Sequence, residues 1–116
     1  MIIQITNLSK RDKKYLELAC RLAQQSECST KHGAVLVKGG HIIAVGFNKP
    51  RNSSAVERRH YTVHAEIDCL NQAKRTEGAI LYVARINNNS RPMFSCPCEN
   101  CMVAIHEAGI RKVYYT

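Results

Sequence analysis

One histidine and two cysteines in this sequence have the types and spacing of a metal site. His64 comes before the run Pro97-Cys98-Glu99-Asn100-Cys101, and a predicted strand lies between the two. Zinc prefers thiolate and imidazole ligands in a tetrahedron, and a catalytic zinc site uses three protein ligands so that the fourth position can hold water. We therefore predict that His64, Cys98 and Cys101 bind Zn²⁺.

The two cysteines lie where a helix is predicted to begin. Pro97 is favoured as a first helical residue, so we expect a helix from Pro97 to Gly109 with both sulfurs on one side of its first turn. The free amides and positive dipole end of that turn lower thiol pKa values and favour the thiolates a metal needs. His64 stands at the start of another predicted helix, so two helix N-termini would face one point.

Glu66 follows His64 too closely to be a natural second ligand to the same ion, but it can reach a water on that ion. Its predicted role is proton transfer. A Cys-x-x-Cys pair also occurs in structural zinc sites and redox pairs, and His-x-Glu alone is a common triplet. A structural site would need a fourth ligand, and a redox pair would leave His64 and Glu66 without a role. The combination therefore favours catalytic zinc.

The run His64-Ala65-Glu66, followed by Pro97-Cys98-Glu99-Asn100-Cys101, matches the zinc deaminase signature. From its first helix to its last strand, the chain resembles the deoxycytidylate and tRNA-type branch of the cytidine deaminase-like superfamily. The resemblance implies a three-layer α/β/α fold, assembly into homo-oligomers, and hydrolytic deamination of a base. It also implies that Ala65 presents its backbone amide to the base and that Asn48, in a Gly-x-Asn match, contacts sugar or base. An Asn chosen for turn geometry is the alternative at position 48.

In such an enzyme, zinc would lower the pKa of its bound water and Glu66 would take the proton, so that hydroxide attacks the carbon bearing the exocyclic amine. Glu66 would then protonate the ring nitrogen and the leaving amine. Proton shuttling of this kind contributes about 10²–10⁴ in rate. Cytosine would become uracil and ammonia would leave.

At two positions this chain differs from the families that share the signature. Many deoxycytidylate deaminases have Asn where this chain has Asp68, and adenosine-acting tRNA enzymes often have Glu where it has Cys96. Cys96, separated from the helix by Pro97, is predicted to form a pocket wall. Our first reading is deamination of a nucleotide such as dCMP. The alternative is a deaminase of cytosine or adenine in single-stranded DNA or RNA, including tRNA, and a third reading is a non-catalytic zinc-stabilised binding module.

The segment 49–62, which leads into His64, is rich in basic residues. With 17 Lys and Arg against 9 Asp and Glu, the chain has a net charge of +8, which favours contact with phosphate on a nucleotide or a nucleic acid. We expect Arg51, Arg58 and Arg59, with Lys49, to meet that phosphate near the pocket mouth. Solvated loop charge is the alternative reading.

Hydrophobic periodicity predicts the elements that position these residues. A helix over 9–25 capped by Ser9 is followed by strands 33–38 and 41–47 joined by Gly39-Gly40, a helix over 65–74, a strand over 79–84, the helix after Pro97 and a last strand over 111–116. A strand, helix, strand succession requires a right-handed crossover, so the last two strands should be parallel neighbours in a mixed sheet. Ile2 to Ile5 is either an edge strand or a disordered or partner-bound terminus.

Length and composition set the frame for this assignment. At 116 residues with 45% apolar content, the chain is expected to form a single domain over 1–116, cytoplasmic and without membrane association, because it has no long apolar run. The remaining cysteines Cys20, Cys28 and Cys69 have no partner spacing and are predicted to be small core residues. His32, His41 and His106 are predicted to be surface or turn residues.

Overall fold

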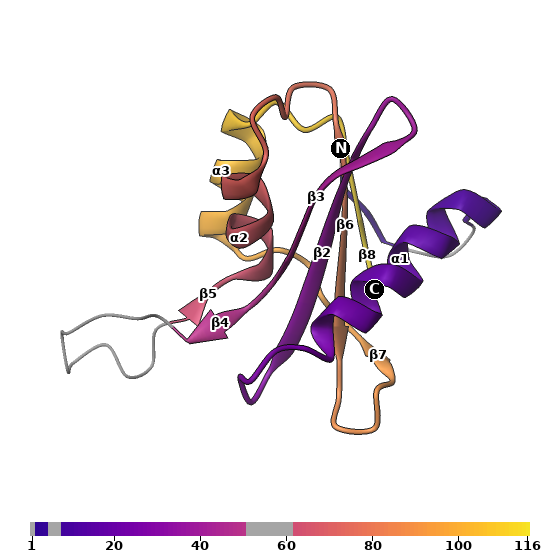
Figure 1. The fold of residues 1–116 in the computed structure, drawn as a ribbon, viewed down its shortest axis with the longest axis vertical. Helices are drawn as coiled ribbons and strands as arrows, with labels where there is room; N and C mark the ends of the chain where they lie inside the picture. The colour runs from indigo at the N-terminus through magenta and orange to yellow at the C-terminus, as the bar shows by residue number, and fades with distance from the viewer. Residues whose placement is uncertain (1, 5–7, 51–61) are drawn as a thin grey trace, which may run out of the picture.

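In the computed structural model, a mixed β-sheet lies between helices on its two faces (Figure 1). The structure describes residues 2–4, 8–50 and 62–116. Helix α1 (Lys10–Ala23) covers one face, and α2 (Ala65–Gln72) and α3 (Glu99–Glu107) cover the other. The predicted three-layer α/β/α architecture is therefore confirmed.

The sheet has the strand order β1-β8-β6-β2-β3, with β7 paired to β6. Its strands are β1 (Ile2–Gln4), β2 (Lys31–Lys38), β3 (His41–Phe47), β6 (Ile80–Ile86), β7 (Pro92–Met93) and β8 (Lys112–Tyr115). Strand β2 is antiparallel to both β3 and β6, whereas β6 and β1 are each parallel to β8. The strand–helix–strand unit from β6 through α3 to β8 thus has the parallel pairing that a crossover connection gives. Of the two readings of the N-terminus, the edge strand is the one the structure adopts.

Two glycines form the turn between β2 and β3. Gly39 and Gly40 have φ values of +59° and +79°. A two-residue hairpin turn of the type that matches strand twist needs positive φ at both positions, which glycine adopts without strain. The hairpin predicted from Gly39-Gly40 is confirmed.

Strand β2 packs into both layers because its side chains alternate between the two faces. Ala34 and Leu36 belong to the apolar cluster under α2 and α3, and Val35 and Val37 belong to the cluster under α1. All four are buried. The continuous apolar run of a strand covered on both faces is the sequence signature of such a middle layer.

The helix ends differ from the predicted ones by a few residues. Helix α1 has Ser9 as its N-cap, as predicted, with the Ser9 side chain accepting from the Asp12 N–H at 3.1 Å. Helix α3 starts later than predicted: Cys98 is its N-cap, in extended conformation with ψ of 168°, so Pro97 precedes the helix. The prediction that Pro97 opens the helix is therefore wrong, because the chain is still extended at Cys98.

Helix α3 stops where glycine allows the chain to reverse. Gly109 has φ of +73°, and its N–H and that of Ile110 donate to the carbonyls of His106 and Ile105 at 3.0 and 3.3 Å. This bond pattern satisfies the last carbonyls of a helix. The turn at Gly109 directs the chain from the end of α3 into β8. Within the described residues, no helix is long and apolar enough to cross a bilayer.

Candidate metal centre

Two helix N-termini bring the candidate ligands together. His64 is the N-cap of α2, Cys98 is the N-cap of α3, and Cys101 lies in the first turn of α3. The three candidate ligand atoms lie within 4.8 Å of one another. His64 Nδ1 is 3.2 Å from Cys101 Sγ and 3.5 Å from Cys98 Sγ.

This donor set fits zinc. Ligand atoms that sit at zinc's bonding distances around a tetrahedron are themselves about 3.5 Å apart. One imidazole and two thiols leave a fourth position for water or substrate. Among the residues that the structure describes, this is the only cluster of at least three such side chains.

The two N-cap positions have unusual residues for helix capping. Ser, Thr, Asp and Asn are preferred there because their side chains accept from free amides of the first turn. His64 and Cys98 make no such hydrogen bond. Their side chains are therefore available to bind a metal, while the positive end of each helix dipole favours negative charge at the same point.

Glu66 lies beside the candidate ligands in the first turn of α2 and is 4% exposed. Burial raises the pKa of its carboxyl, whereas its own backbone N–H, the charge of His64 and a hydrogen bond with Cys101 act in the lowering direction. Burial and the neighbouring Glu66 also raise the pKa of the Cys101 thiol. A thiolate at that position therefore needs a cation beside it, which agrees with a metal site.

A pocket of about 410 Å³ opens beside this centre. That volume lies in the range of small-molecule sites. Its wall combines residues at the start of α2, residues at and before the start of α3, the residue directly after β3, and the segment that precedes and begins β2. The lining residues are Cys28, Ser29, Thr30, His32, Asn48, His64, Ala65, Glu66, Cys96 and Cys98.

Asn48 holds one wall of this pocket through its side chain. Its Oδ1 accepts from the His32 N–H at 2.9 Å and its Nδ2 donates to the Thr30 carbonyl at 2.5 Å. The Asn48 carbonyl accepts from the buried Ser26 hydroxyl at 2.8 Å. Asn48 is 5% exposed, so the side chain predicted to touch substrate already fixes the backbone that carries Thr30 and His32. Contact with substrate stays a prediction.

His32 and Cys28 were not predicted to belong to a site. The expectation that His32 is a surface or turn residue is wrong, because β2 begins at Lys31 and includes His32. Burial first, and then the charges of Arg85 and His64, lower the pKa of His32 to about 4, so its imidazole is neutral at physiological pH. Cys28 lines the pocket and is not a core residue.

The other predicted core and surface residues lie as expected. Cys69 is fully buried, and Cys20 is half-buried against the α1 cluster. His41 and His106 are exposed.

The predicted phosphate contacts fall into two groups. Arg51, Arg58 and Arg59 lie outside the described residues. Lys49 Nζ is 3.3 Å from Asp68 Oδ1, so this lysine is paired within the protein. Of the described residues, no lysine or arginine lines the pocket.

Comparison with known proteins agrees with this site. The family model of the cytidine and deoxycytidylate deaminase zinc-binding region matches residues 9–116. A crystal structure of dCMP deaminase from the cyanophage S-TIM5 aligns with a TM-score of 0.75 and 27% identity, over 94% of this chain and 84% of that chain.

Two curated relatives differ in the substrate that their names give. The deoxycytidylate deaminase of Schizosaccharomyces pombe is 32% identical over 90% of this chain and 36% of its own length. The tRNA-specific adenosine deaminase of Agrobacterium fabrum is 37% identical over 72% of this chain and 49% of its own length. This chain therefore spans half or less of these two relatives.

The chain belongs to the family defined by the cytidine and deoxycytidylate deaminase zinc-binding region. It is a hydrolase of the cytidine/deoxycytidylate deaminase type, and zinc is its metal.

Proposed function

We propose that this protein hydrolyses the exocyclic amine of cytosine in a nucleotide of the dCMP class, giving uracil and ammonia. The observation that carries the proposal is the cluster of His64, Cys98 and Cys101 beside the pocket, with the buried carboxyl of Glu66 in the pocket wall. The similarity to a dCMP deaminase and a deoxycytidylate deaminase supports the choice of substrate.

Each residue has a distinct task in this proposal. When bound by His64, Cys98 and Cys101, zinc supplies the Lewis acidity that makes a water molecule acidic near neutral pH. Glu66 would take one proton from the attacking water and deliver it to the ring nitrogen, and would then take the remaining hydroxyl proton and deliver it to the departing amine, so that the base keeps one proton of the water and ammonia leaves with the other. A carboxyl whose pKa is raised by burial suits a group that takes up and releases a proton twice in one reaction.

The pocket wall provides the groups that orient the base. Ala65 is fully buried at the first position of α2, where a backbone N–H has no partner within the helix. The neutral imidazole of His32 offers one hydrogen-bond donor and one acceptor. Both line the pocket together with Asn48 and Cys96.

Phosphate recognition is assigned to Arg51, Arg58 and Arg59. The segment that contains them continues directly into His64, and the described part of the pocket wall has no lysine or arginine. A nucleotide monophosphate bound beside the metal centre needs cationic partners for its phosphate, and arginine binds phosphate in a bidentate way.

A second candidate function is deamination of a base in single-stranded nucleic acid. The similarity to a tRNA-specific adenosine deaminase and the net charge of +8 favour it. A base extruded from a strand could enter a pocket of the same size.

A mass-resolved activity screen distinguishes these functions. The zinc-loaded protein is offered dCMP, deoxycytidine, cytidine, guanine, single-stranded DNA and tRNA, and each product is examined for replacement of an amine by a carbonyl. We expect dCMP to be converted with the highest kcat/KM. Faster conversion of a polynucleotide would select the second function. If none of these compounds lost an amine and zinc were held by four protein ligands, the result would support a binding module instead.

A further inference from the structure

The carboxylate of Asp68 links α2 to the end of β3. Asp68 stands on α2, and its backbone N–H donates to the His64 carbonyl at 2.9 Å, which closes the first turn. Its Oδ2 accepts from the Phe47 N–H at 3.3 Å. The helix turn that carries His64 and Glu66 is thus attached through one side chain to the last residue of β3.

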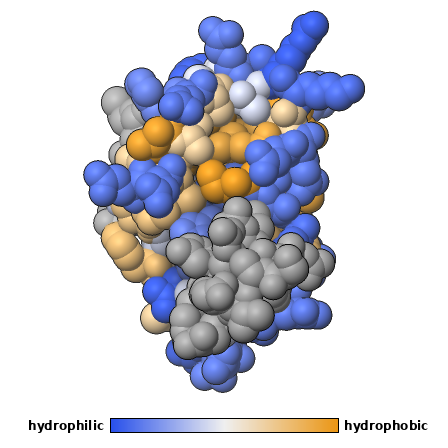
Figure 2. All heavy atoms as spheres, turned by 90° about the vertical axis from the view of Figure 1, so that its left-hand side faces the viewer, coloured by the Kyte–Doolittle hydropathy of each residue, from blue (hydrophilic) through white to orange (hydrophobic). Residues whose placement is uncertain are grey.

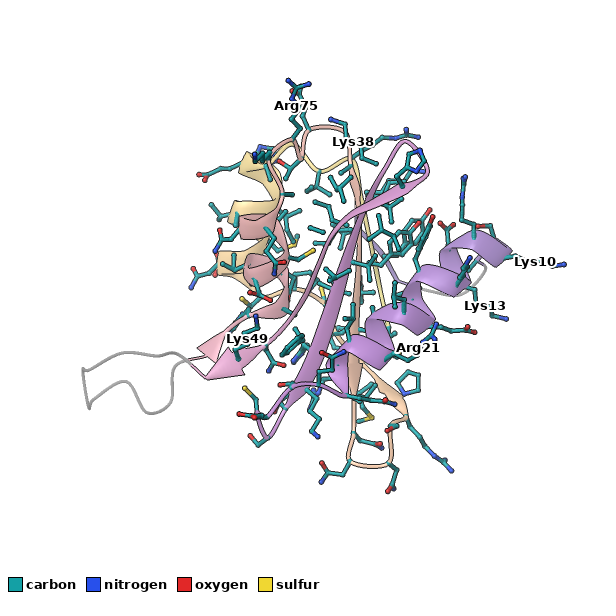
Figure 3. The ribbon with its side chains drawn as sticks, viewed as in Figure 1. Lys10, Lys13, Arg21, Lys38, Lys49 and Arg75 are labelled. Carbon is teal, nitrogen blue, oxygen red and sulfur yellow. The ribbon has the colours of Figure 1, made fainter. Side chains whose placement is uncertain are left out.

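The other oxygen of Asp68 pairs with a lysine on the next strand. Asp68 Oδ1 is 3.3 Å from Lys49 Nζ, with the two side chains 14% and 43% exposed. The Lys49 ammonium also lies over the Phe47 ring, 4.8 Å from its centroid, within the range of a cation–π contact. Two independent contacts therefore hold this lysine over the start of α2, at the position labelled in Figure 3.

Lys49 belongs to the short ladder that leads into the metal centre. It pairs with Val63 in the ladder of β4 (Lys49–Pro50) and β5 (Thr62–Val63), and Val63 is followed directly by His64. The contact of Lys49 with Asp68 therefore joins the strand before His64 to the helix after it.

The backbone of α2 lies directly on β3 at this point. A Cβ placed on Gly46 would be 2.7 Å from the Cys69 nitrogen, 2.8 Å from the Ala65 carbonyl oxygen and 3.0 Å from Asp68 Oδ2. Such a close approach leaves little room for adjustment. Because Asp68 Oδ2 is one of the atoms at this contact, loss of its carboxylate is expected to let the first turn of α2 shift against β3.

We propose that Asp68 is a positioning residue, which together with Lys49 sets the orientation of His64 and Glu66 by fixing the first turn of α2 against the β3–β4 corner. This inference rests on the proposed function. An asparagine at position 68 can still accept from the Phe47 N–H, but it has no charge to pair with lysine.

Four variants test this role: Asp68→Ala, Asp68→Asn, Lys49→Met and the double variant Asp68→Asn/Lys49→Met. Each is measured for kcat and KM on the best substrate, for zinc affinity by competition with a chromophoric chelator, and for Tm. Glu17→Gln, which removes one exposed carboxylate on α1, is the matched control for charge.

Asp68→Ala should lower kcat and zinc affinity by about 10- to 100-fold, as loss of a group that orients metal ligands does, with little change in KM. Asp68→Asn and Lys49→Met should each show a smaller loss, and the double variant should be no worse than either single one because both remove the same pair. Glu17→Gln should behave as the wild type.

A lower Tm with unchanged kcat and zinc affinity in Asp68→Ala would overturn the proposal and leave Asp68 a merely stabilising residue. Additive losses in the double variant would overturn the pairing with Lys49. If the wild type deaminated no base offered, the zinc affinities would still test the positioning of His64, so failure of the proposed function and failure of this inference give different results.

Discussion

At the scale of single residues, Glu66 is the side chain whose chemistry the proposed reaction depends on most. Replacement by glutamine keeps the size of the side chain and removes its ability to take a proton. We expect Glu66→Gln to bind zinc with the wild-type stoichiometry, measured by metal analysis, and to lose at least about 10²-fold in kcat.

The outcome separates the proton-transfer role from a ligand role. If Glu66 were a metal ligand, the glutamine variant would lose zinc as well as activity. Full turnover in this variant would contradict the assigned mechanism. Cys98→Ser is the complementary control, because it removes a candidate ligand, leaves Glu66 in place and should reduce zinc binding first.

At the scale of elements, the site depends on how closely helices approach the sheet. Gly46 of β3 faces the backbone of α2, and Gly33 of β2 faces the backbone of α1 near Ala19 and Ala23. These two glycines allow the two helical layers to sit against the sheet. Gly46 contacts the helix that carries His64 and Glu66, whereas Gly33 contacts α1, which carries neither of them.

Gly46→Ala should therefore displace α2, because its new Cβ would be 2.7 Å from the Cys69 nitrogen and backbone cannot move as a flexible side chain does. We expect a loss of about 1–3 kcal/mol in the free energy of unfolding, measured by chemical denaturation, together with weaker zinc binding. Gly33→Ala is the matched control. It should also destabilise the fold, but the protein that remains folded should keep its zinc affinity. Equal zinc affinity in both variants would contradict the dependence of the site on the α2–β3 contact.

The sequence could predict those elements whose structure is specified by a few neighbouring residues. Gly39-Gly40, the Ser9 cap and the apolar run of β6 each specify structure within a few residues, and the family signature identified His64, Glu66 and the two cysteines. The sequence could not predict that His32 and Cys28 line the pocket, because this depends on where β2 begins. It also depends on the hydrogen bond between the His32 N–H and the Asn48 side chain, which is 16 residues further along the chain. The alternation of His32, Ala34 and Leu36 on one face of β2 was the available signal. The Asp68–Lys49 pair likewise requires the tertiary contact of α2 with β3.

At the scale of the whole molecule, the positive charge is spread over several surfaces. Lys10, Lys13 and Arg21 project from α1, on the opposite side of the sheet from α2 and α3 (Figure 3). The face formed by α2 and α3 shows apolar groups among hydrophilic ones (Figure 2), and Val103 of α3 is 54% exposed. Among the described residues that line the pocket there is no lysine or arginine. Self-association stays a prediction.

This distribution leads to a test of nucleotide against polynucleotide. If a single phosphate is recognised, Arg58→Gln and Arg59→Gln should raise the KM for dCMP and leave the KM for deoxycytidine unchanged, because the nucleoside has no phosphate to lose. Lys13→Gln and Arg21→Gln on α1 should change neither value.

A polynucleotide substrate would instead contact several cations, and each lost phosphate contact would reduce the slope of log affinity against log salt by about 1. Steep salt dependence of single-stranded DNA or tRNA binding that weakens in the α1 variants would contradict the nucleotide assignment, since α1 could contribute only to a substrate long enough to reach around the sheet.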